Sequence, residues 1–353
     1  MADGFSPGGA CPIPLSDYPR VSLAHGGGGR LMQQLIRRML APAFAGSVAE
    51  AQHDGARLPP LIGTPVMTTD SYVIRPRFFP GGDIGSLAVQ GTVNDLAMCG
   101  AQPLYLTLGL ILEEGLPMDE LWRIVQSIHG AATAAGVQIV SGDTKVVEQG
   151  QADGIYINTA GMGAVPEGLR VHPDRVAPGD RILVSGDIGR HGIAVLSQRE
   201  QLGFETTLAS DCAALHTLVQ ALLTAAPDTH CLRDCTRGGL GAALIEIGEA
   251  AAMELHVEEG GVPVSPPVSA ACELLGLEPL FVACEGRLVA FVPEVQAEAA
   301  LAALRAHPLG EGATAIGHVA PPTAHGARVV MHSPYGTSRL LDLPSGEQLP
   351  RIC

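Results

Sequence analysis

The stretch 104–112 is almost continuously apolar, and it constrains the fold of the first half more than any other feature. A short apolar run without polar alternation is typical of a buried strand. It lies between two segments, 84–99 and 118–135, whose apolar residues recur at helical spacing. We predict further strands over 65–74, 137–147 and 155–165, and a first helix over 31–40. This half is therefore predicted to be an α/β domain.

Pro, Gly and Asp gather over 166–180, and we place a domain boundary there. A chain of 353 residues favours two domains. Beyond the boundary, strands are predicted over 181–185, 287–292 and 329–332, and helices over 191–201 and 238–251. The polar segment 333–353 is predicted to be an extended arm. The expected parts are an N-terminal arm (1–21), two domains (22–168 and 169–332) and a mobile tail (333–353).

The chain is acidic, with 21 Lys and Arg against 36 Asp and Glu and a formal net charge of −15. Such a surface repels nucleic acid and anionic lipid, so neither is an expected partner. An acidic site still binds nucleotide when magnesium bridges carboxylate and phosphate. The N-terminus lacks a signal-like segment, and no run of about 18 apolar residues is present. We therefore expect a cytoplasmic protein that does not span a membrane.

Eight cysteines are present, and thiols are the expected state in that compartment. Cys231 and Cys235 lie four residues apart beside His230, which leaves a metal pair open. The usual zinc signature needs a second pair, and none is found, so thiols are favoured. A non-catalytic thiol or metal scaffold built on these three residues remains an alternative to an enzyme.

Three short segments place an acid at a predicted strand end or helix start. Singly, each Asp is an ordinary cap or turn residue. Together they favour a magnesium-phosphate site, because magnesium takes a few carboxylates and completes its shell with substrate phosphates. Lys145 would neutralise charge on a transferred phosphoryl group. The segments are 68–71 with Asp70, 91–95 with Asn94 and Asp95, and 141–145 with Asp143 and Lys145.

Glycine-rich turns are the second kind of candidate. Gly26, Gly27 and Gly28 belong to a run of four glycines that leads into the first predicted helix. This run is either a phosphate-covering loop or a hinge, and it matches neither a Walker nor a Rossmann motif. The segment 234–241, which begins at Asp234, is a second candidate anion nest. For a similar turn over 185–192, tight-turn chemistry is the better interpretation.

Two single residues complete the candidates. Glu285 lies just before a predicted strand in apolar surroundings. It is either an exposed carboxylate or a general base with a raised pKa. Cys353 ends the chain on the polar arm, where a thiol is free to visit several sites as a covalent carrier must.

The motifs occur in a fixed order: HGGGGR (25–30), TTDSYV (68–73), GTVNDLAMCGA (91–101), SGDTKVV (141–147), DCTRGGLGAAL (234–244) and PRIC (350–353). From about residue 25 onward the chain resembles the HypE family of hydrogenase maturation factors. That family belongs to a superfamily with aminoimidazole ribonucleotide synthetase, selenophosphate synthetase and thiamine-monophosphate kinase. The terminal PRIC is the specific motif, since the others occur across the superfamily in looser form.

The resemblance implies a two-domain aminoimidazole ribonucleotide synthetase-like α/β (α+β) fold with a flexible C-terminal tail. It implies a homodimer in which the N-terminal strands pair into a barrel, and ATP bound between the domains under Gly26, Gly27 and Gly28. By motif match, Asp70, Asn94, Asp95 and Asp143 hold magnesium and phosphates, and Asp234 is a further member. The expected magnesium ligands are Asp70, Asp95 and Asp143.

The resemblance also implies the reaction. HypF loads a carbamoyl group onto Cys353, and ATP-dependent dehydration converts it to a thiocyanate. The cyanide then passes to iron on the HypC–HypD complex for [NiFe]-hydrogenase. Glu285, with Lys145, is our hypothesis for proton removal. The tail spans at most ~70 Å when extended, so it reaches both the cleft and an external partner. The alternative enzyme is a superfamily kinase or synthetase that acts on a free small molecule.

Overall fold

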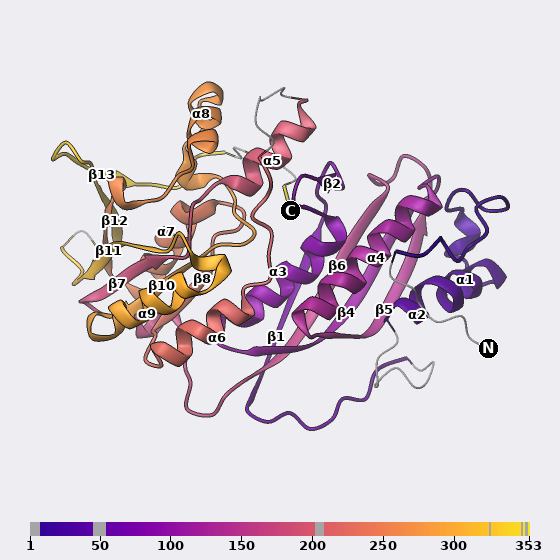
Figure 1. Ribbon diagram of the computed structural model, residues 1–353, viewed down its shortest axis with the longest axis horizontal. Helices are drawn as coiled ribbons and strands as arrows, with labels where there is room; N and C mark the ends of the chain where they lie inside the picture. The colour runs from indigo at the N-terminus through magenta and orange to yellow at the C-terminus, as the bar shows by residue number, and fades with distance from the viewer. Residues whose placement is uncertain (1–7, 45–53, 202–207, 325, 347–348, 350–351) are drawn as a thin grey trace.

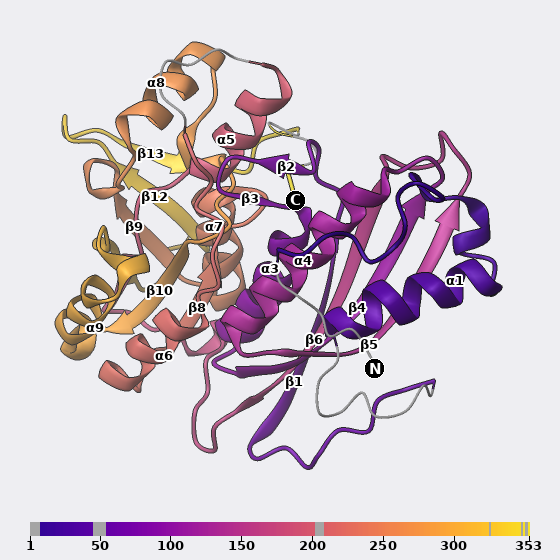
Figure 2. The same cartoon turned by 45° about the vertical axis from the view of Figure 1, so that its right-hand side comes forward.

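The computed structural model describes residues 8–44, 54–201, 208–324, 326–346, 349 and 352–353. Two sheets and their helices form two adjacent parts, and the C-terminus lies between them (Figures 1 and 2). The N-terminal part has these elements: η1 Leu23–His25, α1 Arg30–Leu35, η2 Ile36–Leu40, α2 Ala41–Phe44, β1 Thr64–Tyr72, β2 Phe78–Phe79, β3 Gly82–Asp83, α3 Ile84–Met98, β4 Gln102–Glu113, α4 Met118–Ala135, β5 Gln138–Val147 and β6 Ile155–Val165.

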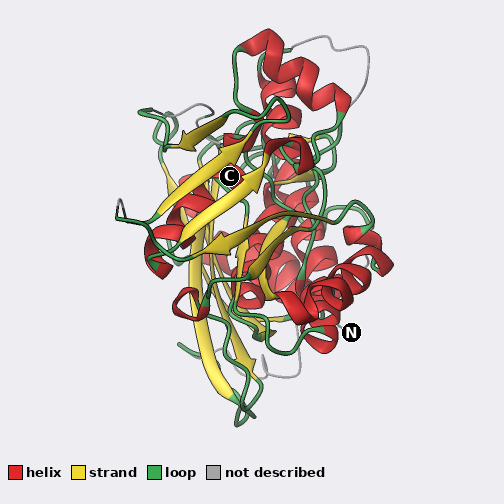
Figure 3. Cartoon of the chain, turned by 90° about the vertical axis from the view of Figure 1, so that its left-hand side faces the viewer, coloured by secondary structure: helices red, strands yellow, loops and turns green. Residues whose placement is uncertain are grey.

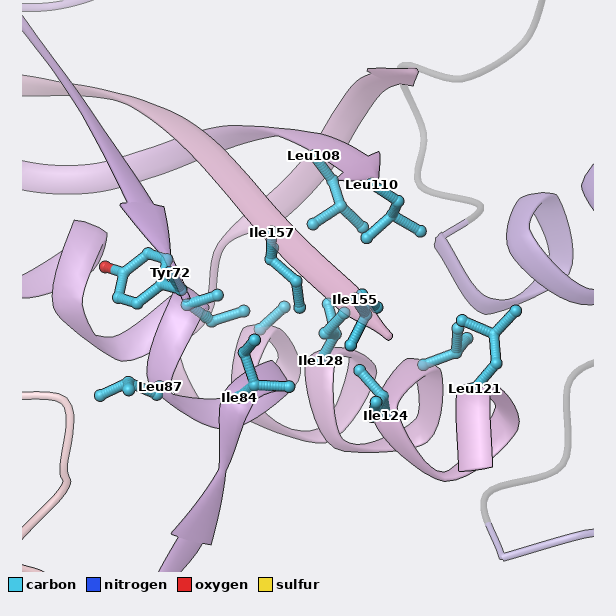
Figure 4. Close-up of a cluster of buried hydrophobic side chains, with 14 of the residues drawn as sticks. Tyr72, Ile84, Leu87, Leu108, Leu110, Leu121, Ile124, Ile128, Ile155 and Ile157 are labelled. Carbon is cyan, nitrogen blue, oxygen red and sulfur yellow. The ribbon is translucent and has the colours of Figure 1, made fainter. Parts of the chain in front are cut away.

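The N-terminal sheet has four long strands in the order β1-β6-β4-β5. Strand β6 is antiparallel to both of its neighbours, whereas β4 and β5 are parallel. Helices α3 and α4 cover one face, and their apolar side chains meet those of the strands in a continuous core (Figure 4). The edge strands are therefore β1 and β5, which lie three strands apart.

Helix α3 is almost entirely buried because it packs against both parts of the molecule. Its small residues allow this close approach: a Cβ at Gly91 would lie 2.3 Å from the hydroxyl oxygen of Tyr72. Asp83 caps the helix by accepting from the N–H groups of Gly85 and Ser86. Helix α4 ends at Ala135 and is capped by Gly136, whose φ of 66° favours glycine.

The C-terminal part is built on a seven-stranded sheet in the order β13-β12-β9-β11-β7-β10-β8. Leu183 of β7 faces a core formed with α6 and α9, whereas its neighbours Ile182 and Val184 face a core formed with α7. Figure 3 shows helices on either side of these strands. The end of α3 packs into the α6 and α9 layer through Ala97 and Met98, which joins the two parts.

The elements of the C-terminal part are η3 Pro173–Arg175, β7 Asp180–Val184, α5 Arg190–Arg199, α6 His216–Ala225, β8 Cys231–Asp234, α7 Gly239–Ala251, β9 Glu254–Glu258, η4 Glu259–Gly261, α8 Pro266–Leu275, η5 Pro279–Phe281, β10 Leu288–Pro293, α9 Glu294–Ala306, η6 Pro308–Gly310, β11 Thr314–Ala320, β12 Arg328–His332 and β13 Ser338–Leu341.

The predicted α/β class is confirmed, and the helices and strands expected before residue 166 are all present within a few residues. The sequence prediction missed α6, α8, α9, β8, β9 and β11 in the second half. The expected arm over 333–353 needs a correction, because Ser338–Leu341 forms β13 and pairs antiparallel with β12. That hairpin belongs to the sheet. None of the helices in the described parts of the chain has the length and apolar character to cross a bilayer.

Candidate active site

The last residue of the chain lies against the end of β1. The N–H of Val73, which follows this strand, donates to a main-chain carboxylate oxygen of Cys353 at 3.1 Å. The side chain of Ile352 is 5% exposed and belongs to the same apolar cluster as Tyr72. Burial raises the pKa of the Cys353 thiol from 9.0 to about 12, and Glu285 and Asp70 add to the shift. The docked cysteine is therefore a neutral thiol beside two carboxyl groups.

The N-terminal part supplies Asp70 on β1 and Asp95 on α3. Asp70 points to the helix-covered face of the sheet, as Tyr72 does two residues later. The hydroxyl of Thr68 donates to Oδ2 of Asp95 at 2.9 Å. Burial raises the pKa of Asp95, and the charge of Asp70 raises it further. These two carboxylates are thus near enough to repel each other.

The C-terminal part supplies Asp234 at the end of β8 and Glu285 just before β10. Both are buried, at 6% and 3% exposure. Burial, followed by the charge of Asp95, raises the pKa of Asp234 to about 7. Burial also raises the pKa of Glu285 well above its ordinary value, and Asp234, Asp211 and Asp70 contribute next. Of the alternatives for Glu285, burial holds and surface exposure does not.

Two buried oxygens here, Oε1 of Glu285 and Oδ2 of Asp211, have no hydrogen-bond partner among the described residues. Unpaired buried carboxyl oxygens are costly unless a ligand or ion completes them. We call Asp70, Asp95, Asp234, Glu285 and Cys353 the β1 site.

The structure gives Asn94 a different position from the predicted nucleotide contact. Its amide nitrogen donates to the carbonyl oxygens of Ala213 at 3.0 Å and Glu285 at 3.4 Å. Its amide oxygen accepts from the N–H of Leu215 at 2.7 Å. With both ends engaged and 1% exposure, Asn94 fastens α3 to the C-terminal part. It positions the main chain of Glu285 in the β1 site through the hydrogen bond to its carbonyl oxygen.

Asp143 does not join this site within one chain. Asp70 lies opposite Thr159 on β6, and Thr159 lies opposite Leu108 on β4. Leu108 in turn lies opposite Gly142 on β5. Asp143 is the next residue, so its side chain points to the other face of the sheet, and three strand spacings of ~4.8 Å separate it from Asp70. Asp70 and Asp143 therefore cannot bind the same magnesium ion within one chain, and the set of Asp70, Asp95 and Asp143 as magnesium ligands stays a prediction.

The remaining predicted residues accompany Asp143 at the β5 edge. Lys145 donates to Oδ2 of Asp143 at 2.5 Å, and both side chains are about two-thirds exposed. Gly26 packs against this strand, where a Cβ would lie 2.7 Å from the nitrogen of Val146. Gly28 has a φ of 74° and open space around it. We call Gly26, Gly27, Gly28, Asp143 and Lys145 the β5 group; Lys145 does not reach Cys353 of the same chain.

Pockets lie beside both groups. One of about 140 Å³ is formed at the start of α7 by Asp234, Arg237 and neighbours. Another of about 300 Å³ lies between the first helices and β5, lined by apolar side chains such as Met32 and Phe44 and by Asp143. A further pocket, of about 870 Å³ around Arg77 and Glu120, is lined by none of the predicted site residues.

The carboxylates of the β1 site fit magnesium only when phosphates complete its shell. No group of three or more acidic, His or Cys side chains among the described residues converges enough to hold a metal. Magnesium needs only one or two carboxylates when phosphate oxygens supply other ligands. Asp70 and Asp95 are such a pair. Asp234 lies near enough that the charges of both raise its pKa.

The residues considered for a metal pair, Cys231, Cys235 and His230, are buried thiols and a histidine paired with an aspartate. Cys231 and Cys235 are buried free thiols. His230 is hydrogen-bonded through Nδ1 to Oδ2 of Asp180 at 2.8 Å.

Sequence reasoning missed three residues near the β1 site. Arg237 lies inside the predicted anion nest, where it was given no role; its φ is 49°, and its charge opposes the rise in the pKa of both Asp95 and Cys353. Asp211 lies in a segment without any motif. His191 lies in the turn over 185–192, which was interpreted as tight-turn chemistry. Only the arginine in DCTRGG offered a signal that the sequence alone could have given.

Comparison with known proteins decides the family. Residues 54–165 match the N-terminal domain, and residues 177–330 the C-terminal domain, of AIR synthase related proteins. The carbamoyl dehydratase HypE of Azotobacter vinelandii is 54% identical over 94% of this chain and 97% of its own. The chain belongs to the HypE family.

Solved HypE structures share the fold throughout. A HypE crystal structure in complex with ATP is 48% identical and superimposes with a TM-score of 0.90 over 94% of this chain and 99% of that one. A HypE chain from a HypE–HypF complex is 44% identical, with a TM-score of 0.77 over 90% of this chain and 100% of that one. The predicted two-domain fold and the predicted family are confirmed.

Proposed function

We propose that this chain is an ATP-dependent carbamoyl dehydratase that acts on its own Cys353. The observation that carries the proposal is the position of the C-terminus: the N–H of Val73 binds the carboxylate of Cys353 at the end of β1, and the thiol lies beside Glu285 and Asp70. A kinase of a free small molecule has no use for a terminal cysteine in this place. The HypE relatives named above support the same reaction.

The reaction converts a carbamoyl group on sulfur and ATP into a thiocyanate, ADP and phosphate. The amide oxygen leaves once it carries the γ-phosphoryl group of ATP, and the nitrogen loses its two protons. Glu285 is placed to accept a proton, because its buried carboxyl group has an unpaired oxygen and a raised pKa that makes it a strong base once ionised. Val73 and the apolar seat of Ile352 hold the reacting sulfur in position.

Magnesium, when bound, would neutralise phosphate charge and stabilise the phosphoryl group in transfer. Asp70 and Asp95 are the residues that would hold it, with Asp234 beside them. The apolar pocket next to Asp143 has the lining that a purine ring favours. We therefore assign the adenosine half of ATP to the β5 group and the phosphate half to the β1 site.

A homodimer reconciles these two assignments. Both β1 and β5 are edge strands of the four-stranded sheet, and sheet edges offer main-chain groups for pairing with another chain. On the face without helices, Met67 is 69% exposed and Ile111 is 42% exposed. Pairing two sheets into a barrel places β5 of one protomer beside β1 of the other. That arrangement brings Gly26, Asp143 and Lys145 of one chain to the site of its partner.

The expected protein partners are HypF, which loads the carbamoyl group, and the HypC–HypD complex, which receives cyanide for the iron of [NiFe]-hydrogenase. The HypE–HypF complex of a relative supports the first. The place of action is the cytoplasm, where the acidic surface and free thiols are compatible with the reducing conditions.

The test is the intact mass of the protein after incubation with HypF, carbamoyl phosphate and ATP, with Cys353→Ala alongside. We expect a carbamoyl adduct on the wild type alone, and loss of the mass of one water when ATP and magnesium reach the isolated adduct. Failure of active HypF to form an adduct would remove Cys353 from the mechanism and favour a kinase of a free small molecule.

A further inference from the structure

The first turn of α5 contacts the end of the chain. Nε2 of His191 is hydrogen-bonded to the carbonyl oxygen of Ile352, 161 residues away in sequence. His191 has no solvent exposure, and its ring packs edge-on against Phe79. The main-chain oxygens of the last two residues are thus both hydrogen-bonded, the carboxylate of Cys353 to Val73 and the carbonyl of Ile352 to His191. A histidine inside a helix turn has become part of the binding site for the tail.

The hydrogen-bond pattern fixes the tautomer of His191. A carbonyl oxygen only accepts, so Nε2 must carry the proton. Nδ1 lies 2.8 Å from Oγ of Ser210, and that oxygen accepts from the N–H of Cys212 at 3.0 Å. Ser210 is therefore able to donate its hydroxyl proton to Nδ1. The neutral ring, with its donor aimed at the tail, is the form that this environment selects.

The residue after His191 makes room for the tail. A Cβ on Gly192 would lie 2.9 Å from Cδ1 of Leu349 and 2.6 Å from Cγ1 of Val282. Leu349 also packs against the apolar cluster that contains Ile193 and Val268. The tail is therefore held at two points on the same helix turn, by a hydrogen bond at Ile352 and by an apolar seat at Leu349.

This turn is tied to the segment that carries Glu285. Asp187, just before α5, accepts from Arg190 at 2.6 Å and from Arg287 at 2.8 Å. Arg287 also donates to the carbonyl oxygen of Asp187 at 2.9 Å. The helix turn that holds the tail and the loop that holds Glu285 are thus one ion-paired unit. A tail bound to His191 is set in a fixed relation to the carboxyl group beside its sulfur.

We propose that the first turn of α5 is the docking site for the carrier residues Leu349, Ile352 and Cys353, with His191 as the positioning residue that sets the place of the Cys353 sulfur. The ligand of this site is a C-terminal peptide with apolar side chains at 349 and 352 and a main-chain carbonyl at 352 that accepts from His191. The docking proposal rests on the proposed function, because a docked tail serves dehydration only if Cys353 carries the carbamoyl group. The docking itself is a property of the resting thiol form and is measured without any reaction.

Two variants separate the hydrogen bond to the tail from the rest of the ring. In His191→Gln, the side-chain amide reaches the position of Nε2 and keeps a donor for Ile352. In His191→Asn, the shorter amide reaches the position of Nδ1, where Ser210 lies, and leaves Ile352 without a donor. A purely structural role for the histidine would not give the Asn variant a free tail and the Gln variant a docked one.

The measurement is the rate at which iodoacetamide alkylates Cys353, read by mass on the fragment released by cleavage after Glu347. We expect His191→Asn to raise the rate about tenfold, the usual scale of one buried hydrogen bond, and His191→Gln to stay within about threefold of wild type. The carbamoylated Asn variant should lose water more slowly, with an unchanged half-saturating ATP concentration. The Gln variant should recover most of that rate.

A tail-side variant keeps the test valid if both ring variants fold poorly. Ile352→Gly removes the buried side chain from the tail and leaves the body intact, so it should also expose Cys353. Adding His191→Asn to it should produce no further rise, because the tail has already left. Equal alkylation rates in the Asn, Gln and wild-type proteins would overturn the docking proposal. A missing carbamoyl adduct would instead remove the proposed reaction and leave the docking result standing.

Discussion

The β1 site and the β5 group arise from the same kind of sequence signal, an acid next to a strand end or a turn, but the fold treats them differently. In the β1 site, burial raises the pKa values of Asp95, Asp234 and Glu285. In the β5 group, the hydrogen bond from Lys145 lowers the pKa of Asp143, which is exposed. The motif supplies the carboxyl group, and the surroundings decide whether it is a buried acid with a raised pKa or an exposed charge.

The difference assigns distinct tasks to the two regions. A buried cluster with unpaired oxygens and a docked thiol suits proton transfer and the binding of a cation with its phosphates. An exposed ion pair beside glycines suits a contact with an incoming polyanion, since it costs little to rearrange. Substitutions in the β1 site should therefore lower the rate of the chemical step strongly. Substitutions in the β5 group should change the free energy of unfolding less than substitutions of the buried residues around the β1 site.

The largest expected effect is that of Glu285→Gln on dehydration. The substitution keeps the size of the side chain and removes the base, so the rate should fall by about 10²–10⁴, the usual contribution of a general base. The measurement follows loss of one water from the isolated carbamoyl adduct by intact mass after ATP is added. Loading by HypF should proceed, because the proposed role of Glu285 is confined to the dehydration step. Dehydration at the wild-type rate would exclude Glu285 as the base.

The next effect concerns stability. Asn94→Ala leaves the buried N–H of Leu215 and the carbonyl of Ala213 without a partner, so the free energy of unfolding should fall by about 1–3 kcal/mol. Asp143→Asn, the matched control in the β5 group, should change it by less than about 0.5 kcal/mol because its ion pair is exposed. Urea denaturation followed by circular dichroism measures both. Similar losses in the two variants would contradict the contrast between the regions.

The sequence sufficed for the elements whose patterns are long. The helices over 84–98 and 118–135 and the strand between them were predicted because each has a sustained apolar pattern. Strand β8 has four residues, and β13 lies in a polar segment, so periodicity gives no signal for either. Their places depend on the sheet they join.

The same limit applies to the site. Asp70, Asp95, Asp234, Glu285 and Cys353 were identified as candidates, and they do gather at one place. The separation of Asp143 from them depends on strand order and register, which no local motif encodes. The contact of His191 with Ile352 joins residues 161 positions apart, so the turn that contains His191 looks ordinary in the sequence. Long-range packing, and not residue type, supplied what was missed.

The pH dependence of Cys353 gives a sharper test of burial at the β1 site. The docked thiol has a pKa of about 12, against 9.0 in its ordinary state, so the docked form binds the proton more tightly. Docking is at full strength below pH 9 and weakens as the pH rises from 9 toward 12, by about tenfold per unit. Alkylation of Cys353 should therefore keep rising between pH 9 and 10.5.

A synthetic peptide with the sequence of residues 343–353 is the control for that experiment. Its free thiol has no docked state, so its alkylation rate should level off above pH 9. Parallel curves for the protein and the peptide would show that the resting tail is not buried at the β1 site in solution. Circular dichroism at each pH confirms that the body of the protein remains folded.

The smallest signal, and the one that tests how the two regions combine, comes from mixing two inactive variants. If β5 of one protomer completes the β1 site of the other, a hybrid of Lys145→Ala and Cys353→Ala chains contains one intact site. Random exchange makes about half of the dimers hybrids, each with one of two sites working, so about a quarter of the wild-type activity should return. A mixture of Glu285→Gln and Cys353→Ala is the matched control. It should regain nothing, because both residues serve the site of the same chain. If the first mixture dehydrates no faster than its separate parents, Lys145 does not act at the site of the partner. The assignment of the adenosine half of ATP to the β5 group and the phosphate half to the β1 site would then be wrong.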